Sequence, residues 1–98
     1  MIEITQDKDA IILTGHAGAP PDLVCEDITA LLQCLLFSLD KLTEDVIEYR
    51  VKKGHAFLRY DEDLSADARL LIESFFVGCE AVADAFPEKV RVSRPARH

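Results

Sequence analysis

The sequence predicts an α+β fold in which two amphipathic helices cover one face of a small mixed β-sheet. Two long segments repeat apolar residues every three or four positions, which is typical of helices that bury one side. Short segments around them alternate apolar and polar residues or are rich in β-branched residues, as half-buried strands are. The expected order is strand, strand, helix, strand, strand, helix, strand. At 98 residues this order fills one domain, residues 1–92, followed by a basic tail, residues 93–98.

The N-terminal segment predicts a β-hairpin. Ile2 and Ile4 alternate with polar neighbours, and a polar turn over residues 6–9 leads into a β-branched strand over residues 10–14. That strand stops at Gly15, where the backbone can bend sharply.

A loop and the first helix follow the hairpin. Residues 17–21 are small or Gly and Pro, which is typical of a loop, and Asp22 is a suitable N-cap. The helix that follows has one apolar stripe over about four turns. The stripe consists of Ile28, Leu31, Leu32, Leu35, Leu36 and Leu39.

The middle of the chain returns to the strand pattern. Alternation over residues 46–51 and the apolar run over residues 56–60 predict a second hairpin, with its turn at residues 52–55. The lysines of this turn and Arg50 are expected to form a solvated basic tip, and His55 to have only a loop role.

A second helix and a last strand complete the fold. Ser65 is the expected N-cap, and helical register continues to Pro87, which stops the helix. Residues 88–92 predict a short strand, and residues 93–98 a frayed basic end.

Composition excludes several classes of protein. A net charge of −7 argues against a general nucleic-acid binder, which needs a basic surface. Mean hydropathy is +0.07, and no apolar run approaches the roughly 18 residues of a membrane span. The first residues lack the basic start and apolar stretch of a secretory signal, so a cytoplasmic location is expected, with no membrane partner.

The cysteines are expected to be reduced thiols. There are three of them, an odd number, and no CxxC pair occurs. No histidine lies at a zinc-ligand spacing from a cysteine pair, so neither a metal site nor a cofactor is expected. Cys34 and Cys79 lie on or beside the apolar stripes, where core or interface thiols are inert.

His16 and Cys25 are the candidate catalytic pair, because they flank the Gly/Pro loop between the second strand and the first helix. A cysteine becomes a good nucleophile only as thiolate, which an imidazole or a helix N-terminus stabilises. Both devices are present in this segment. The alternative is a turn histidine and a thiol buried as a small hydrophobe.

The residues of this segment resemble those of the ribosomal-processing cysteine protease family Prp. The matching strings are residues 15–18 (Gly-His-Ala-Gly), 22–25 (Asp-Leu-Val-Cys) and 29–31 (Thr-Ala-Leu). The likeness extends over nearly the whole chain, including Gly78 in the second helix. It implies a small α+β homodimer that removes the N-terminal extension of a large-subunit ribosomal protein, or cleaves a related phage protein.

The resemblance also implies roles for single residues. Cys25 is the nucleophile and His16 the general base and acid, with Gly15 supporting the turn between strand and loop. Asp22 matches an aspartate of the family, with a helix cap as the alternative role. Thr29 takes the place of a family serine, and its alternative is a hydrogen bond to the carbonyl of Cys25.

Two features depart from the family pattern. The loop between His16 and Cys25 is shorter, and Glu26 and Asp27 stand where the family has small residues. Carboxylates beside a thiol disfavour the thiolate unless they point to solvent, or they select a basic substrate.

Three functions therefore remain open from the sequence. A cysteine endopeptidase is the leading hypothesis. A non-catalytic dimeric module that binds the same ribosomal protein is the alternative, favoured by Glu26, Asp27 and the short loop. A redox sensor is the weakest of the three, since no second cysteine lies near Cys25 in the sequence.

Overall fold

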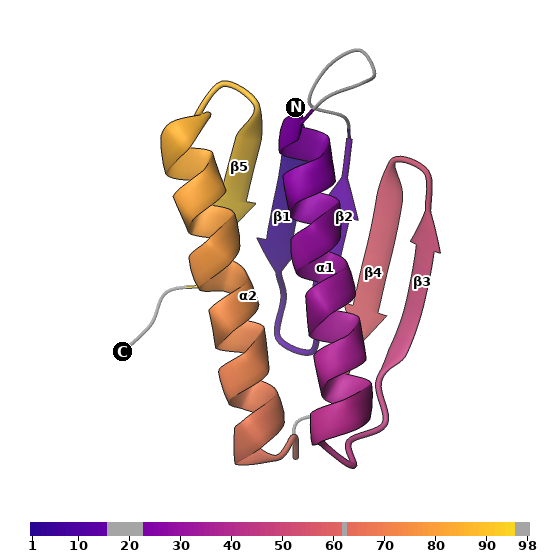
Figure 1. The fold of residues 1–98 in the computed structure, drawn as a ribbon. Helices are drawn as coiled ribbons and strands as arrows, with labels where there is room; N and C mark the ends of the chain where they lie inside the picture. Colours follow the sequence, from indigo (N-terminus) through magenta and orange to yellow (C-terminus); the bar gives the residue numbers. More distant parts are fainter. Residues whose placement is uncertain (16–22, 62, 96–98) are drawn as a thin grey trace.

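The computed structural model describes residues 1–15, 23–61 and 63–95 and confirms the predicted α+β fold (Figure 1). Its elements follow the expected order. They are β1 (Ile2–Gln6), β2 (Ala10–Thr14), α1 (Leu23–Leu42), β3 (Glu48–Lys52), β4 (His55–Arg59), α2 (Ala66–Ala85) and β5 (Val90–Ser93).

The strands form one five-stranded sheet in the order β3-β4-β2-β1-β5. β5 runs parallel to β1, whereas the other neighbouring pairs are antiparallel. Figure 1 shows α1 and α2 side by side on one face of this sheet. The expected mixed sheet with both helices on one face is therefore confirmed.

The core lies between the helices and alternate strand residues. Ile4, Ile11 and Leu58 are fully buried at the centre of the sheet, and Phe76 of α2 is fully buried in the same core. Gly78 lets the helices approach closely, because a Cβ there would lie 2.9 Å from Cδ2 of Leu31.

Several predicted strand boundaries were wrong. β3 begins at Glu48, not at residue 46, and β4 ends at Arg59, not at residue 60. The turn of the second hairpin consists of Lys53 and Gly54 alone, so His55 is the first residue of β4. Gly54 has a φ of +78°, a conformation that glycine adopts without strain and that lets two residues connect the strands. The last strand begins at Val90, not at residue 88, and it includes Ser93.

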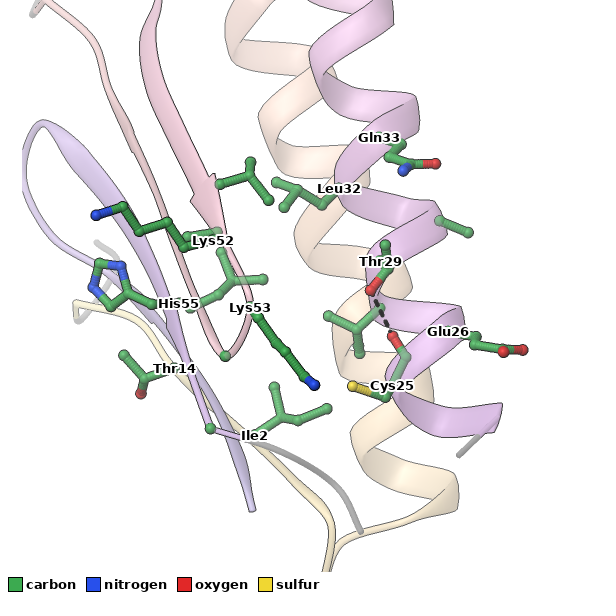
Figure 2. Close-up of a pocket in the computed structure, with 17 residues that line it drawn as sticks. Ile2, Thr14, Cys25, Glu26, Thr29, Leu32, Gln33, Lys52, Lys53 and His55 are labelled. Carbon is green, nitrogen blue, oxygen red and sulfur yellow. Dashed lines mark hydrogen bonds between the residues drawn. The ribbon is translucent and has the colours of Figure 1, made fainter. Parts of the chain in front are cut away.

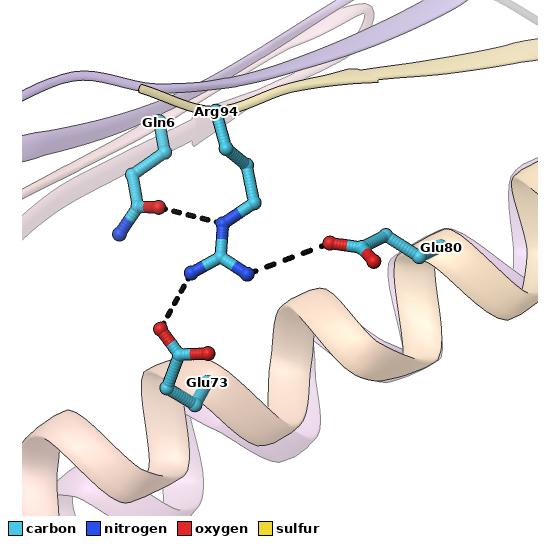
Figure 3. A network of polar contacts seen from close by, with 4 residues as sticks. All are labelled: Gln6, Glu73, Glu80 and Arg94. Atoms are coloured by element: carbon cyan, nitrogen blue, oxygen red, sulfur yellow. Dashed lines mark hydrogen bonds and ion pairs between the residues drawn. The ribbon is translucent and has the colours of Figure 1, made fainter. Parts of the chain in front are cut away.

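The frayed tail that we expected from residue 93 is also wrong for its first residues. Arg94 lies between sheet and helix, and its side chain is only 14% exposed (Figure 3). Its guanidinium donates to Gln6 at 2.7 Å, pairs with Glu73 and Glu80 of α2, and stacks 4.4 Å from the ring centre of Phe76. A guanidinium can satisfy several acceptors in one plane while it stacks on an aromatic ring, so Arg94 fixes the end of β5.

The N-cap predicted at Ser65 is confirmed, since its hydroxyl oxygen accepts from the N–H of Ala68. Asp45 ties this cap to the segment before β3. One carboxylate oxygen accepts from the N–H of Ser65 at 2.8 Å, and the other from its hydroxyl. These hydrogen bonds lower the pKa of Asp45 from its ordinary value of 3.8.

Candidate active site

Gly15 lies where β2 ends and the candidate loop begins. Its φ is +97°, and a Cβ there would lie 2.1 Å from the carbonyl oxygen of Met1, so no other residue fits. Its N–H donates to the carbonyl oxygen of Gly54 at 3.0 Å. The hydrogen bond joins the end of β2 to the tip of the β3–β4 hairpin.

Two of the candidate residues, His16 and Asp22, lie outside the described residues. Their roles as general base and as helix cap or catalytic support stay predictions. Cys25 is described, and it lies in the first turn of α1, half-buried. The first turn of a helix favours negative charge, which suits a residue that must react as a thiolate.

Cys25 lines an open cavity of about 680 Å³ between α1 and the β3–β4 hairpin (Figure 2). The helix wall includes Cys25 and Thr29, the floor includes Leu13 of β2, and the hairpin wall includes Lys53 and His55. Figure 2 shows the sulfur of Cys25 and the ammonium group of Lys53 directed into the space between the two walls. A volume of this size accommodates several residues of a peptide.

Thr29 makes the hydrogen bond that was one of its two expected roles, and its role in catalytic support stays a prediction. The hydroxyl donates to the carbonyl oxygen of Cys25 at 2.8 Å, as the alternative predicted. The bond anchors the side chain on the first turn of α1, and the hydroxyl oxygen at the cavity wall keeps its capacity to accept.

Glu26 and Asp27 are both exposed. Glu26 lies at the rim of the cavity, and Figure 2 shows its carboxylate turned away from the sulfur of Cys25. Water screens an exposed carboxylate strongly, so Glu26 does little to oppose a thiolate. Glu26 therefore points to solvent, which is the arrangement in which, by the sequence analysis, a carboxylate beside Cys25 does not disfavour the thiolate.

The sequence did not predict the hairpin tip as part of the site. Lys52, Lys53 and His55 were expected to be solvated loop residues; all three are exposed, and they also line the cavity. The reason is the strand order, because β4 pairs with β2 in a register that sets Thr14 opposite His55. A basic turn with a histidine was the available signal, but sequence alone does not give the strand order.

The three thiols, all described, have different surroundings and form no disulfide. Cys34 is exposed, and its sulfur lies 3.9 Å from the hydroxyl of Ser38. Cys79 is fully buried in α2, where desolvation and then the charge of Glu80 raise its pKa to about 12. Of the three, only Cys25 combines partial burial with a place on the cavity wall.

The described part of the chain contains no group of three or more His, Cys, Asp and Glu that could hold a metal ion. None of the helices in the described part is both long enough and apolar enough to cross a membrane.

Comparisons with known proteins point to one family. A family model described as cysteine protease Prp matches residues 1–91. The fold is similar to that of the essential ribosomal processing protease Prp from Staphylococcus aureus, solved with a covalently linked product peptide. That match has a TM-score of 0.85 and 21% identity, and it covers 96% of this chain and 97% of the other.

Two further structures share the fold. The same Staphylococcus aureus protease with a substrate peptide gives a TM-score of 0.83 at 20% identity, with 96% and 97% of the two chains covered. A protein from Streptococcus mutans gives 0.78 at 22% identity, covering 98% of this chain and 93% of the other. At such identities the structural matches show the fold alone. No curated protein matches the sequence.

Proposed function

Because the chain belongs to the cysteine protease Prp family, we propose that it is an endopeptidase that removes the N-terminal extension of a large-subunit ribosomal protein or cleaves a related phage protein. One observation carries the proposal. Cys25 lies in the first turn of α1 on the wall of a peptide-sized cavity. The Staphylococcus aureus relative, a ribosomal processing protease, supports the choice of substrate.

The proposed reaction uses Cys25 and His16. His16 takes the thiol proton, and the thiolate attacks the scissile carbonyl carbon. Backbone N–H groups at the first turn of α1, those of Cys25 and Glu26, stabilise the tetrahedral oxyanion. The imidazolium then protonates the leaving amine, and water hydrolyses the resulting thioester.

The test is to incubate the purified protein with the ribosomal protein that carries its extension and to determine new N-termini by mass spectrometry. We expect a single new N-terminus, which disappears with Cys25→Ala and with His16→Ala. Cys34→Ala is the matched control, since that exposed thiol lies outside the cavity lining, and it should cleave like the wild type. Cleavage by Cys25→Ala would refute the proposal.

The second candidate is a module that binds the same protein without cutting it. The acidic pair Glu26 and Asp27, both exposed at the first turn of α1, favours it because these carboxylates suit a basic partner. Stable co-purification of the ribosomal protein with both wild type and Cys25→Ala, without cleavage, would support this candidate.

We further propose that the chain acts in the cytoplasm as a homodimer. Phe37 of α1 and Leu70 and Val77 of α2 are 62%, 69% and 65% exposed. Large apolar side chains with such exposure on two neighbouring helices suit an interface between subunits. Sedimentation should give a dimer for the wild type and a monomer for Phe37→Glu, whereas Thr5→Glu, on an exposed sheet position, should leave the dimer intact.

A further inference from the structure

The β3 strand is an open edge of the sheet beside the cavity. It is the outermost strand next to β4, and all five of its residues are exposed. The far edge strand, β5, instead buries Val90 and packs on α2. An edge strand offers a row of backbone donors and acceptors to any extended chain that reaches it.

The hydrogen bonds around β4 show which backbone groups of β3 face outward. Tyr60 donates to Asp9, and the carbonyl of Gly54 accepts from Gly15, so the even-numbered residues of this segment face β2. The odd-numbered residues of β4 therefore face β3, where they pair with Glu48, Arg50 and Lys52.

It follows that the N–H and C=O groups of Tyr49 and Val51 point away from the sheet, because these groups alternate along an antiparallel strand. Their side chains lie on the face that the helices cover, since Tyr49 pairs with the buried Leu58 and Val51 with the buried Ala56. Even so, Tyr49 and Val51 are 57% and 53% exposed.

The edge and the cavity are continuous, because Val51 also lines the cavity that contains Cys25. A chain paired with β3 would have its backbone bonded to Tyr49 and Val51 and would enter the cavity at the hairpin tip. The exposed apolar side chains of these two residues would cover an apolar side chain of that segment.

We propose that the substrate binds as an additional strand on the open edge of β3, bonded to the backbone of Tyr49 and Val51, with an apolar side chain against them. The inference rests on the proposed function, because its occupant is the peptide to be cleaved. Backbone pairing supplies affinity for an extended segment of varied sequence, and the apolar contact supplies selectivity.

The first test measures amide hydrogen exchange by NMR. The probe is a synthetic peptide that spans the N-terminal extension and the residues after it, added to Cys25→Ala. We expect exchange of the Tyr49 and Val51 amides to slow by about tenfold or more, as new backbone hydrogen bonds protect them. The amide of Arg50, already bonded to β4, is the internal control and should change little.

The second test removes the outward backbone N–H of Val51, one of the proposed hydrogen-bond donors to the substrate. Proline at position 51 lacks the outward N–H but keeps the bonds between β3 and β4, so the hairpin should tolerate it. Val51→Pro should lower kcat/KM for the peptide about tenfold, whereas Val51→Ile, which keeps both the N–H and an apolar β-branched side chain, should lower it much less. Melting temperature and the rate of Cys25 alkylation by iodoacetamide should not change, which excludes a collapsed site.

The outcomes separate this inference from the proposed function. Cleavage by the wild type without protection of Tyr49 and Val51 overturns the edge-strand proposal alone. Protection without cleavage keeps it and refutes the protease. A peptide that neither binds nor is cleaved refutes both. Protection already present without peptide would assign the edge to a second copy of the chain and overturn the inference.

Discussion

The two edge strands of the sheet, β5 and β3, differ in how far they are buried. At the β5 edge, Val90 is 2% exposed, α2 packs on the strand, and Arg94 bonds to both layers. At the β3 edge every residue is exposed, and the strand borders the cavity that contains Cys25. The closed edge of the sheet therefore lies away from the candidate site, whereas the open edge borders it. An entering substrate needs an accessible strand and an open cavity, which a sealed edge would deny.

The largest difference is expected between the alkylation rates of the buried thiol of Cys79 and the exposed thiol of Cys34. The pKa of about 12 for Cys79 lowers its thiolate fraction about a thousandfold relative to the ordinary value of 9.0. Cys79 should therefore resist iodoacetamide at neutral pH for as long as the protein stays folded, while the exposed Cys34 reacts. Peptide mapping by mass spectrometry measures both rates. Equal rates for the two thiols would contradict the buried environment of Cys79.

Gly15→Ala should destabilise the open side of the sheet, at the end of β2. The added Cβ would meet the carbonyl oxygen of Met1, and the positive φ adds strain. We expect a loss of about 3 kcal/mol in the free energy of unfolding, measured in urea. Gly54→Ala, with its φ of +78°, is the control for strain alone and should lose only about 1 kcal/mol. Similar losses for both would show that the contact with Met1 relaxes.

Arg94→Ala should weaken the closed edge. The substitution removes the ion pairs with α2, the bond to Gln6 and the stacking on Phe76. We expect a loss of about 2 kcal/mol in stability without a change in kcat/KM of the folded enzyme. Arg91→Ala is the matched control, because its ion pair with Glu3 is 3.6 Å long and exposed, and it should cost under about 0.5 kcal/mol.

The smallest effect is expected at Asp45, which joins the segment before β3 to the cap of α2. Its folded pKa lies below 3.8, so its contribution to stability is present above that pH and is lost as pH falls through the folded pKa. Asp45→Asn should therefore be slightly less stable than the wild type at neutral pH. Urea unfolding at several pH values should show the gap closing in acid; a constant gap would rule out the carboxylate as its source.

Much of the fold could be predicted from local pattern. The stripe of α1, the cap at Ser65 and the stop at Pro87 each follow from residues near one another in the sequence. The anchoring of Arg94 could not be predicted, because its partners Gln6 and Glu73 are distant in the chain. A basic residue in a short polar segment at the end of the chain looks the same in the sequence whether its side chain is solvated or buried in a hydrogen-bond network.

The candidate site, too, could be predicted from the sequence only in part. The place of Cys25 at a helix start followed from its spacing to the apolar stripe. The lysines of the hairpin tip were missed, because their approach to Gly15 depends on β4 pairing with β2. Strand order is set by long-range packing, which alternation along a single strand does not encode.

The measurement that tests the central claim most directly compares residual cleavage with the modification of each thiol during partial alkylation by iodoacetamide. Mass spectrometry gives the modified fraction of Cys25, Cys34 and Cys79 in each sample, and the same samples are assayed for cleavage of the ribosomal protein. We predict that Cys25 reacts fastest and that activity falls in proportion to its modification alone. Full activity in a sample whose Cys25 is completely alkylated would contradict the assignment of Cys25 as the nucleophile.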